Sequence, residues 1–288
     1  FKPIHFSLFK DYETPKKTQL FFMPDINYSL YDGIVIGSKF YNNGVTFNKL
    51  NLELKPLYSS EENTLVGSFR GSYVFQNQEK NNYRTQLNIS ASSYFYDKKS
   101  RYQILVPGIT FYFRTPDLRS NKRHYLRLFY YDVEREESID ADPNYQILNF
   151  RHNFTNRNAI YDFKTEGSFQ VSDQFGKVDF TAELRKLLTN GRQLGIRFFA
   201  GKFLWHDQIS TKFFDFNLVR PKDYLFRYNY FGRSENDGIF SQQIVMAEGG
   251  FKSIHNPSSA NDYLLATNLT LGVWKWVEAY ADFGLVKN

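Results

Sequence analysis

The clearest pattern in the chain is an alternation of apolar and polar residues over 82–96, which reads NYRTQLNISASSYFY. Every second residue from Tyr83 to Phe95 gives a mostly apolar set with an aromatic residue at each end, and the residues between them are polar. Successive side chains of a β-strand point to opposite faces of the sheet, so this period of two predicts a two-faced strand. The segment is long enough for a transmembrane strand, which needs about 9–11 residues and carries aromatic residues at the membrane interfaces.

The same unit recurs along the chain, separated by short turns rich in Gly, Asn and Asp. Asp32-Gly33 and Asn190-Gly191 are dipeptides typical of β-hairpin turns. The alternation predicts no helix and about fourteen strands, at 19–29, 34–41, 50–59, 65–76, 82–96, 102–114, 125–135, 145–154, 161–172, 175–187, 194–205, 240–253, 263–274 and 277–286. An open sheet of this many strands would leave long unpaired edges, so we expect a closed antiparallel barrel, with sixteen strands in the full protein.

The direction in which the apolar faces point separates two folds. A soluble β-sandwich or lipocalin-like barrel has its apolar face inside, whereas a membrane barrel has it outside. Strand length and the aromatic strand ends favour lipid on the outside. The inward set would then carry mixed charge, as a water-filled or plugged lumen does; it includes Lys164, Glu166, Asp179, Glu183 and Arg185. The predicted fold is therefore an all-β, antiparallel transmembrane β-barrel in lipid, in the outer membrane of a Gram-negative bacterium.

Composition agrees with this prediction and excludes several other classes. Aromatic residues make up 19% of the 288 residues, the mean hydropathy is −0.51, and there is no cysteine. No run approaches the roughly 18 apolar residues of a membrane helix, and a disulfide framework or thiolate site is ruled out. The net charge of +6 is spread along the sequence without a basic block, so nucleic acid is not a predicted partner.

The sequence carries no recognisable catalytic motif. H-E-x-x-H, G-x-S-x-G, the P-loop and the dinucleotide fingerprint are all missing, and the five histidines are scattered. We therefore predict no catalytic, metal or cofactor site in these residues, and no cofactor. The acidic segment 134–144 is interpreted as a solvated loop.

The inward charges have two interpretations. Arg84 with Glu53, and Arg185 with Glu166, are candidates for opposed charges inside the barrel. They would either set ion selectivity or, as we favour, form a ladder across the lumen that satisfies buried charge.

Residues 206–238 break the strand rhythm and are too long for a turn. Long loops of this kind are usually functional or disordered, and the aromatic residues here need burial. We expect the segment to fold into the lumen. Its candidate residues are Arg220, Arg233 and Glu235, with Arg233 paired to an inward carboxylate such as Glu248.

Five stretches resemble the C-terminal barrel of Bacteroidetes gluzincin-type aminopeptidases: YDGIVIG at 31–37, FRTPDLRSNKR at 113–123, RPKDYLFRYNYFGRSE at 220–235, SQQIVMAEGGFKS at 241–253 and DFGLVKN at 282–288. More distantly, the layout resembles the bacterial surface-antigen barrel superfamily, which includes the outer-membrane assembly insertase. That superfamily has sixteen strands and a loop between strands eleven and twelve that carries an Arg-Gly motif inside the lumen. The corresponding stretch here reads Phe231-Gly232-Arg233-Ser234, which departs from that motif.

The resemblance implies a division of the protein into parts. Residues 1–18 would be a lead-in from an upstream domain that holds the zinc site, and 19–288 a single barrel cut short at its C-terminal end. This barrel would anchor the upstream metallopeptidase in the outer membrane and could also help to export it. It would perform no chemistry itself. Two alternatives stay open: an insertase or translocation barrel, and a passive diffusion channel.

Overall fold

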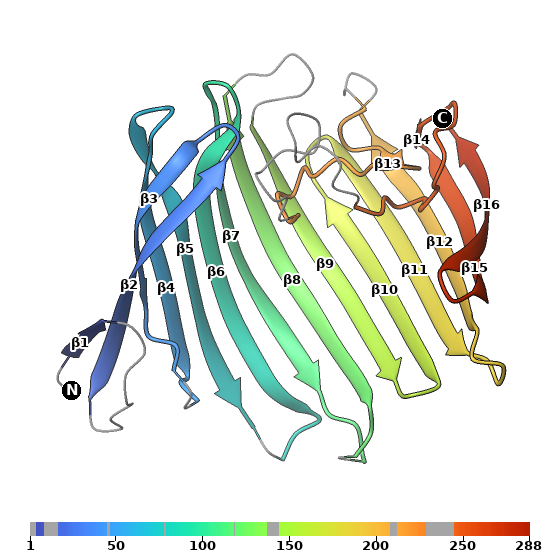
Figure 1. The fold of residues 1–288 in the computed structure, drawn as a ribbon, viewed down its shortest axis with the longest axis horizontal. Helices are drawn as coiled ribbons and strands as arrows, with labels where there is room; N and C mark the ends of the chain where they lie inside the picture. The colour runs from blue at the N-terminus through green and yellow to red at the C-terminus, as the bar shows by residue number, and fades with distance from the viewer. Residues whose placement is uncertain are drawn as a thin grey trace.

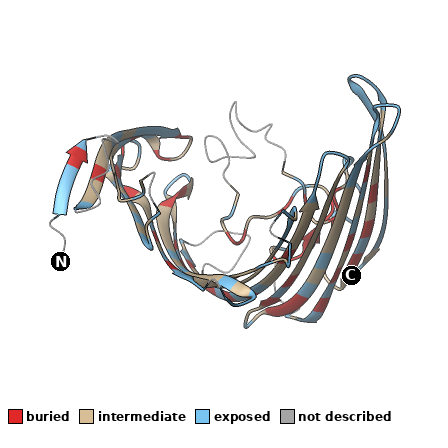
Figure 2. Cartoon of the chain, turned by 90° about the horizontal axis from the view of Figure 1, so that it is seen from below, coloured by how far each residue is buried: buried red, intermediate tan, exposed pale blue. Residues whose placement is uncertain are grey.

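One large sheet dominates the computed structural model, which describes residues 4–8, 17–44, 47–77, 79–117, 119–136, 144–207, 212–228 and 245–288. The sheet has fourteen strands in the order β1 to β12, β15, β16, and a separate two-stranded sheet joins β13 to β14 (Figure 1). Seen from below, the large sheet curves into an open trough (Figure 2). The all-β, mainly antiparallel fold class is therefore confirmed.

The strand bounds are as follows. They are β1 Ile4–Leu8, β2 Thr18–Ser29, β3 Gly33–Tyr41, β4 Leu50–Ser59, β5 Thr64–Gln76, β6 Asn82–Asp97, β7 Ser100–Phe113, β8 Lys122–Arg135, β9 Asn144–Arg157, β10 Tyr161–Val171, β11 Phe175–Leu187, β12 Gln193–His206, β13 Phe216–Asn217, β14 Ser259–Ala260, β15 Tyr263–Trp274 and β16 Val277–Lys287.

The predicted strands are present with one exception, each with its ends within a few residues of the prediction. The exception is 240–253: residues 245–253 form no strand, and 240–244 lie outside the described residues. The count of fourteen is nevertheless reached, because β1 joins the sheet from the region expected to be a lead-in. In the large sheet, the strand that follows β12 is therefore β15. The connection between these two strands runs from 207 to 262 and is longer than the predicted loop.

The first two strands show how a proline is accommodated within β2. β1 pairs in parallel with the first part of β2, from Thr18 to Phe22. Beyond that point β2 is an edge strand, and Pro24 lies there opposite Ser38 of β3. Proline lacks an N–H and is tolerated on an edge strand. The strand consequently continues through Pro24 to Ser29.

The two ends of the sheet run in the same direction. Every consecutive pair from β2 to β16 is antiparallel, and an even number of such pairings separates β2 from β16. Within the described residues β1 and β16 are the two ends of the sheet. Closure into a barrel therefore stays a prediction, and antiparallel closure between β2 and β16 would require an odd number of additional strands.

The two faces of the sheet differ as the alternation predicts. On 82–96 Tyr83, Leu87 and Ile89 of the apolar set are exposed, with Leu87 44% accessible, and Gln86 donates to Asn88 on the opposite face. Phe95, which the sequence placed at a membrane interface, is instead buried in a small cluster with Val35 and Leu57. Exposed apolar side chains recur at alternate positions along the other strands, among them Leu52, Leu54, Leu65, Phe75, Ile89, Leu105, Leu148, Phe150, Val178, Phe180, Ile196 and Phe198. No helix in the described part of the chain is long and apolar enough to cross a membrane.

Candidate functional site: the filled concave face

Residues 212–228 and 245–260, which we call the plug, lie against the concave face of the sheet. They come from the long connection between β12 and β15 and include the small β13–β14 sheet (Figure 1). A second main-chain link within the plug joins the N–H of Gly249 to the carbonyl of Asn217 over 2.9 Å. The described parts of the segment expected to enter the lumen thus lie inside the curve of the sheet.

The plug contributes an apolar layer to the core of the molecule. Phe214, Phe216, Leu218, Tyr224 and Leu225 are all buried. They pack on wall residues from β7 to β15, among them Ile104, Val106, Tyr131, Val133, Tyr145, Ile147, Phe175, Phe199, Phe203, Leu264 and Ala266. Burying one large apolar side chain contributes about 1.5–3 kcal/mol, so this layer is the main attachment of the plug.

A buried lysine of the wall is enclosed at this interface. Lys177 of β11 is 1% exposed, and its Nζ donates to the carbonyl oxygen of Phe214 over 2.6 Å. Four ring centroids lie 4.7–5.3 Å from Nζ, two from the wall and two from the plug: Phe175, Phe203, Phe216 and Tyr224. Aromatic faces attract cations, so the cage stabilises the ammonium away from water.

Two tyrosines connect the plug to β9 and β10. The Tyr145 hydroxyl donates to the carbonyl oxygen of Tyr224, and the Tyr224 hydroxyl donates to Oε1 of Gln170 over 2.8 Å. Burial, reinforced by the charge of Glu248, raises the pKa of Tyr224 above its usual range and that of the plug residue Tyr228 to about 12. The Tyr224 hydroxyl therefore stays protonated at neutral pH and remains a donor.

Two carboxylates of the plug accept hydrogen bonds from other residues of the plug. Oε2 of Glu248 accepts the main-chain N–H of Asn217 over 3.1 Å. Buried Asp215 accepts from the Ser259 hydroxyl over 2.8 Å, and Nε2 of His206 lies 3.9 Å from its carboxylate. Glu248, expected on an inward-facing strand, thus lies in a non-strand part of the plug and binds its main chain.

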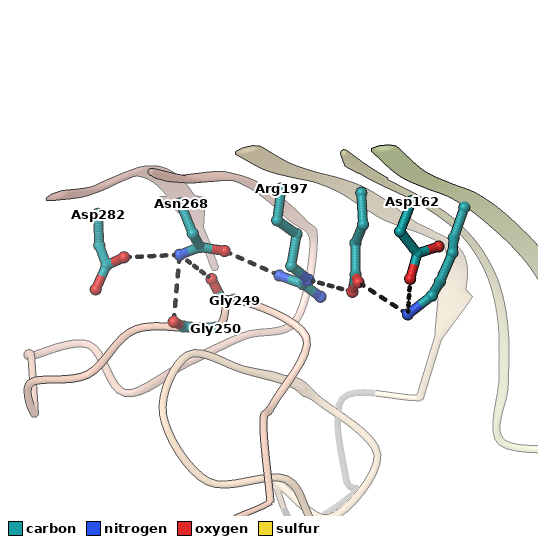
Figure 3. A network of polar contacts seen from close by, with 8 residues as sticks. Asp162, Arg197, Gly249, Gly250, Asn268 and Asp282 are labelled. Carbon is teal, nitrogen blue, oxygen red and sulfur yellow. Dashed lines mark hydrogen bonds and ion pairs between the residues drawn. The ribbon is translucent and has the colours of Figure 1, made fainter. Parts of the chain in front are cut away.

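A row of polar side chains crosses five strands beside the plug (Figure 3). It starts with Asp162 and Lys164 on β10, continues to Glu183 and Arg197, and ends at Asn268 and Asp282. Successive polar atoms along the row are 3.8, 3.9, 3.6, 3.1 and 3.0 Å apart. Each charge therefore has a neighbour of opposite sign or an amide beside it, which reduces the cost of holding charges away from water.

The plug reaches this row at a pair of glycines. Nδ2 of Asn268 lies 3.1 Å from the carbonyl oxygen of Gly249 and 3.2 Å from that of Gly250. Gly250 has φ +65°, and a Cβ on it would lie 2.6 Å from Oδ1 of Asn268. Glycine adopts this conformation without the steric cost that other residues meet, so the contact depends on it.

A polar cavity of about 550 Å³ separates part of the plug from β9–β12. Charged residues of both signs line it, including Arg151, Lys164, Glu166, Asp179, Glu183, Arg197, Arg227 and Glu248. Buried Oδ1 of Asn153, in the same lining, has no hydrogen-bond partner among the described atoms. A cavity of this size and polarity accommodates water.

The opposed charges expected from the sequence have other partners. Glu53 forms an ion pair of 2.8 Å with Lys39, and Arg84 donates to Gln86 and stacks on the ring of Tyr112. The predicted pairing of Arg84 with Glu53 is therefore wrong. The reason is register, because Glu53 lies directly opposite Arg70 on β5, and Lys39 reaches it from β3.

The second expected pair is also separated. Glu166 forms an ion pair of 3.0 Å with Arg151 on β9, whereas Arg185 is exposed near the end of β11, in register with Asp162. The predicted pairing of Arg185 with Glu166 is wrong, because Glu166 lies opposite Thr181. Asp179, a further candidate, accepts from the Ser168 hydroxyl.

The loop candidates divide between described and undescribed residues. Arg220 is exposed on the plug. Arg233 and Glu235 lie outside the described residues, and so does the expected pairing of Arg233 with a carboxylate.

Sequence reasoning missed the residues that contact the plug most closely. Lys177 and Arg197 occupy inward-facing positions of strands that the sequence predicts, but nothing in the sequence distinguishes them from the other polar residues on that face. For Lys177, the one signal is the aromatic residue two positions before it, Phe175.

Two histidines come together on β8 and β9. The rings of His124 and His152 are 4.9 Å apart. In the described part of the chain, however, no three His, Asp or Glu side chains form a group that would hold a metal ion.

Comparisons with known proteins give likenesses among solved structures. No protein-family model matches the chain, and no curated protein matches it. Among solved structures, a crystal structure of a double variant of OccD1 (OprD) is similar, with a TM-score of 0.39 and 11% identity. The match covers 88% of this chain and 64% of that one, so the chain spans less than two thirds of the length of that protein.

Proposed function

We propose that these residues form the lipid-embedded wall of an outer-membrane β-barrel domain in a Gram-negative bacterium, with its concave side occupied by the plug. The observation that carries the proposal is the opposite character of the two faces. Leu87 and Phe180 exemplify the exposed apolar set, and the charged row from Asp162 to Asp282 lies on the concave side. A soluble barrel would have these faces the other way round.

The extent of the exposed apolar set supports lipid as its partner. It runs over nearly every strand of the sheet. Soluble monomers rarely expose apolar patches larger than a few hundred Å². Lipid hydrocarbon chains can cover such an apolar face. Within the membrane, the main-chain N–H and C=O groups must be paired, and the sheet pairs them between strands.

We further propose that this domain serves as an anchor and performs no chemistry itself. The plug favours an anchor over a wide pore, because it covers the wall from β7 to β15 with a packed apolar layer. The five stretches that resemble aminopeptidase barrels favour an upstream metallopeptidase as the anchored domain. An H-E-x-x-H motif in the gene upstream of these residues would support that assignment, and peptidase activity of the purified barrel itself would contradict it.

The membrane proposal is tested by refolding into phosphatidylcholine vesicles. We expect the strands to resist an added protease and the exposed positions to be accessible to lipid-phase quenchers. A protein that stays soluble and monomeric without detergent would contradict the proposal.

Single-channel conductance then separates the anchor from a passive diffusion channel. An anchor with its plug in place should give little conductance, and a variant that loosens the plug should give more. A large, constant conductance in the native protein would favour the channel instead.

An insertase is the other candidate, and the edge of the sheet favours it. In the described residues β16 pairs only with β15, so its outer edge is available for another strand. Photocrosslinking from Tyr280 to a substrate barrel during assembly would support this function, and crosslinks confined to this chain would oppose it.

A further inference from the structure

The turns at the two ends of the sheet differ in charge. Because consecutive strands are antiparallel, the β5–β6, β7–β8, β9–β10, β11–β12 and β15–β16 turns all lie at the lower end in Figure 1. The β2–β3, β4–β5, β6–β7, β8–β9 and β10–β11 turns lie at the upper end, together with the plug. We call the lower set of turns, with the residues that flank them, the basic rim.

The basic rim carries an excess of exposed cations. Six of them, in or beside four of its turns, are Lys80, Arg114, Lys122, Arg123, Arg192 and Lys275. None of the six forms an ion pair with a carboxylate of the described residues. Fewer acids are exposed in the same turns: Asp117 is paired with Arg119 at 3.7 Å, and Glu79 and Glu278 are exposed near Lys80 and Lys275. The rim therefore presents positive charge to whatever lies beside it.

The upper turns have a different character. Glu61, Asp97, Glu134, Glu136 and Asp173 are exposed there. The cations Lys98 and Lys99 lie among them, and the plug at this end adds exposed Lys212, Arg220 and Lys252, so the upper end carries charges of both signs. The difference is therefore between the two ends of the strands, and a net charge of +6 alone does not predict it.

The turns of the basic rim are neighbours in space. The N–H of Arg114 donates to the carbonyl of Asn81 over 2.8 Å, which joins the β5–β6 turn to the β7–β8 turn. Lys122 is in register with Asn156, and a Cβ on Gly272 would lie 3.3 Å from the main chain of Gln193. The cations accordingly form two groups along this end of the sheet, one on each side of the β9–β10 turn.

Two tryptophans place the basic rim at a membrane interface. Trp274 and Trp276, on either side of Lys275, are 73% and 91% exposed. Tryptophan concentrates where hydrocarbon meets headgroups, because its ring is apolar and its N–H needs a polar partner. If the exposed face of the strands lies in lipid, the cations of the rim lie at the level of the headgroups.

We propose that the basic rim binds the phosphate headgroups of anionic phospholipids in the leaflet that it faces. The proposal rests on the membrane function proposed above. Arginine and lysine bind phosphate through charge-assisted hydrogen bonds, and an anionic surface attracts them within about one Debye length. The upper turns lack this excess of cations, so the rim distinguishes the two leaflets by their headgroups.

The three tryptophans of the chain provide reporters at both ends. A variant with Trp205→Phe and Trp274→Phe keeps Trp276 at the rim. A second variant, with Trp274→Phe and Trp276→Phe, keeps Trp205 near the upper end of β12. Each is refolded into phosphatidylcholine vesicles that contain a minor fraction of brominated phosphatidylglycerol or, separately, of brominated phosphatidylcholine.

We expect brominated phosphatidylglycerol to quench Trp276 about twofold more than brominated phosphatidylcholine, because the rim concentrates anionic lipid. Trp205 should show no such difference. Arg192→Gln with Lys275→Gln should abolish the preference at Trp276. The matched control, Lys98→Gln with Lys99→Gln at the other end, should keep it.

The outcomes separate this proposal from the one on which it rests. Equal quenching by both lipids, or a preference that survives the rim substitutions, would overturn lipid binding by the rim and leave insertion into the membrane intact. No quenching of either tryptophan by either lipid would overturn the membrane function and this proposal with it.

Discussion

Lys177 of the wall binds the main chain of the plug, through a 2.6 Å hydrogen bond from its Nζ to the carbonyl oxygen of Phe214. Both groups are buried, and the residues are 37 positions apart in the sequence. The sequence pointed to the reverse arrangement, in which a cation of the loop meets a carboxylate of the wall. In the described residues the wall supplies the cation, and the plug supplies a carbonyl and two of the four rings around it.

Lys177→Met should loosen the plug. The substitution leaves the buried carbonyl of Phe214 without a donor, which costs about 1–3 kcal/mol. We expect trypsin to cleave the refolded protein faster after Arg220 and Lys222, which are in the plug. Lys202→Met, on the exposed side of β12, is the control and should leave the cleavage rate unchanged. Equal rates in all three proteins would show that the lysine does not hold the plug.

Gly250→Ala should displace the plug from Asn268. The new Cβ would meet Oδ1 of Asn268 at 2.6 Å, in addition to the cost of a positive φ. Gly191→Ala is a matched control, because Gly191 has φ +75° but nothing within 4 Å of the added Cβ. Left-handed backbone strain alone costs about 1–2 kcal/mol. We expect Gly250→Ala to increase trypsin cleavage of the plug, and Gly191→Ala to lower global stability without this effect.

Leu87→Arg and Asn88→Arg test which face of β6 lies in lipid. Leu87 is on the exposed apolar face, and an arginine there should reduce the free energy of folding into vesicles by about 2–4 kcal/mol near the midplane. Asn88 bonds to Gln86 and Thr110 on the concave side, so Asn88→Arg should cost only about 1 kcal/mol. Urea titrations of refolded protein measure both. Equal losses would reject the assignment of faces.

Alkaline pH should release the plug. Burial raises the pKa of Tyr224, and raises that of Tyr228 to about 12, so the attached plug holds these protons more tightly than the released plug, where tyrosine titrates near about 10. Attachment is therefore fully stabilised below about pH 10 and weakens as pH rises from there toward 12.

The measurement for this release is proteolysis by subtilisin. We expect the plug to be cleaved faster at about pH 11 than at about pH 9. The double substitution Tyr224→Phe and Tyr228→Phe should reduce that increase, because neither ring then loses a proton. An increase of the same size in the variant would assign the release to other groups.

The sequence by itself determined the strands and their faces. A period of two over 82–96 fixes which residues share a face, since side chains alternate along a strand whatever its neighbours are. The same reasoning located the strands from β2 to β12, β15 and β16 within a few residues. It failed at 245–253, the described part of a predicted strand, where the chain forms a non-strand segment of the plug with Ala247 and Gly249 buried.

Only the tertiary structure decided which inward residues meet. Parity places Glu53, Arg84, Glu166 and Arg185 on the inner face, but the partner of each depends on register and on side-chain reach. The strand register places Arg70 opposite Glu53 and Thr181 opposite Glu166.

The attachment of the plug was likewise a property of the folded chain. Lys177 belongs to an ordinary alternating strand, and its cage includes Phe203, Phe216 and Tyr224 from distant parts of the sequence. The excess of cations at the rim also follows from topology, because antiparallel pairing gathers every second turn at one end of the sheet. Alternation is a local property that each strand carries in its own residues, whereas the cage, the ion pairs and the rim are contacts between segments that only folding brings together.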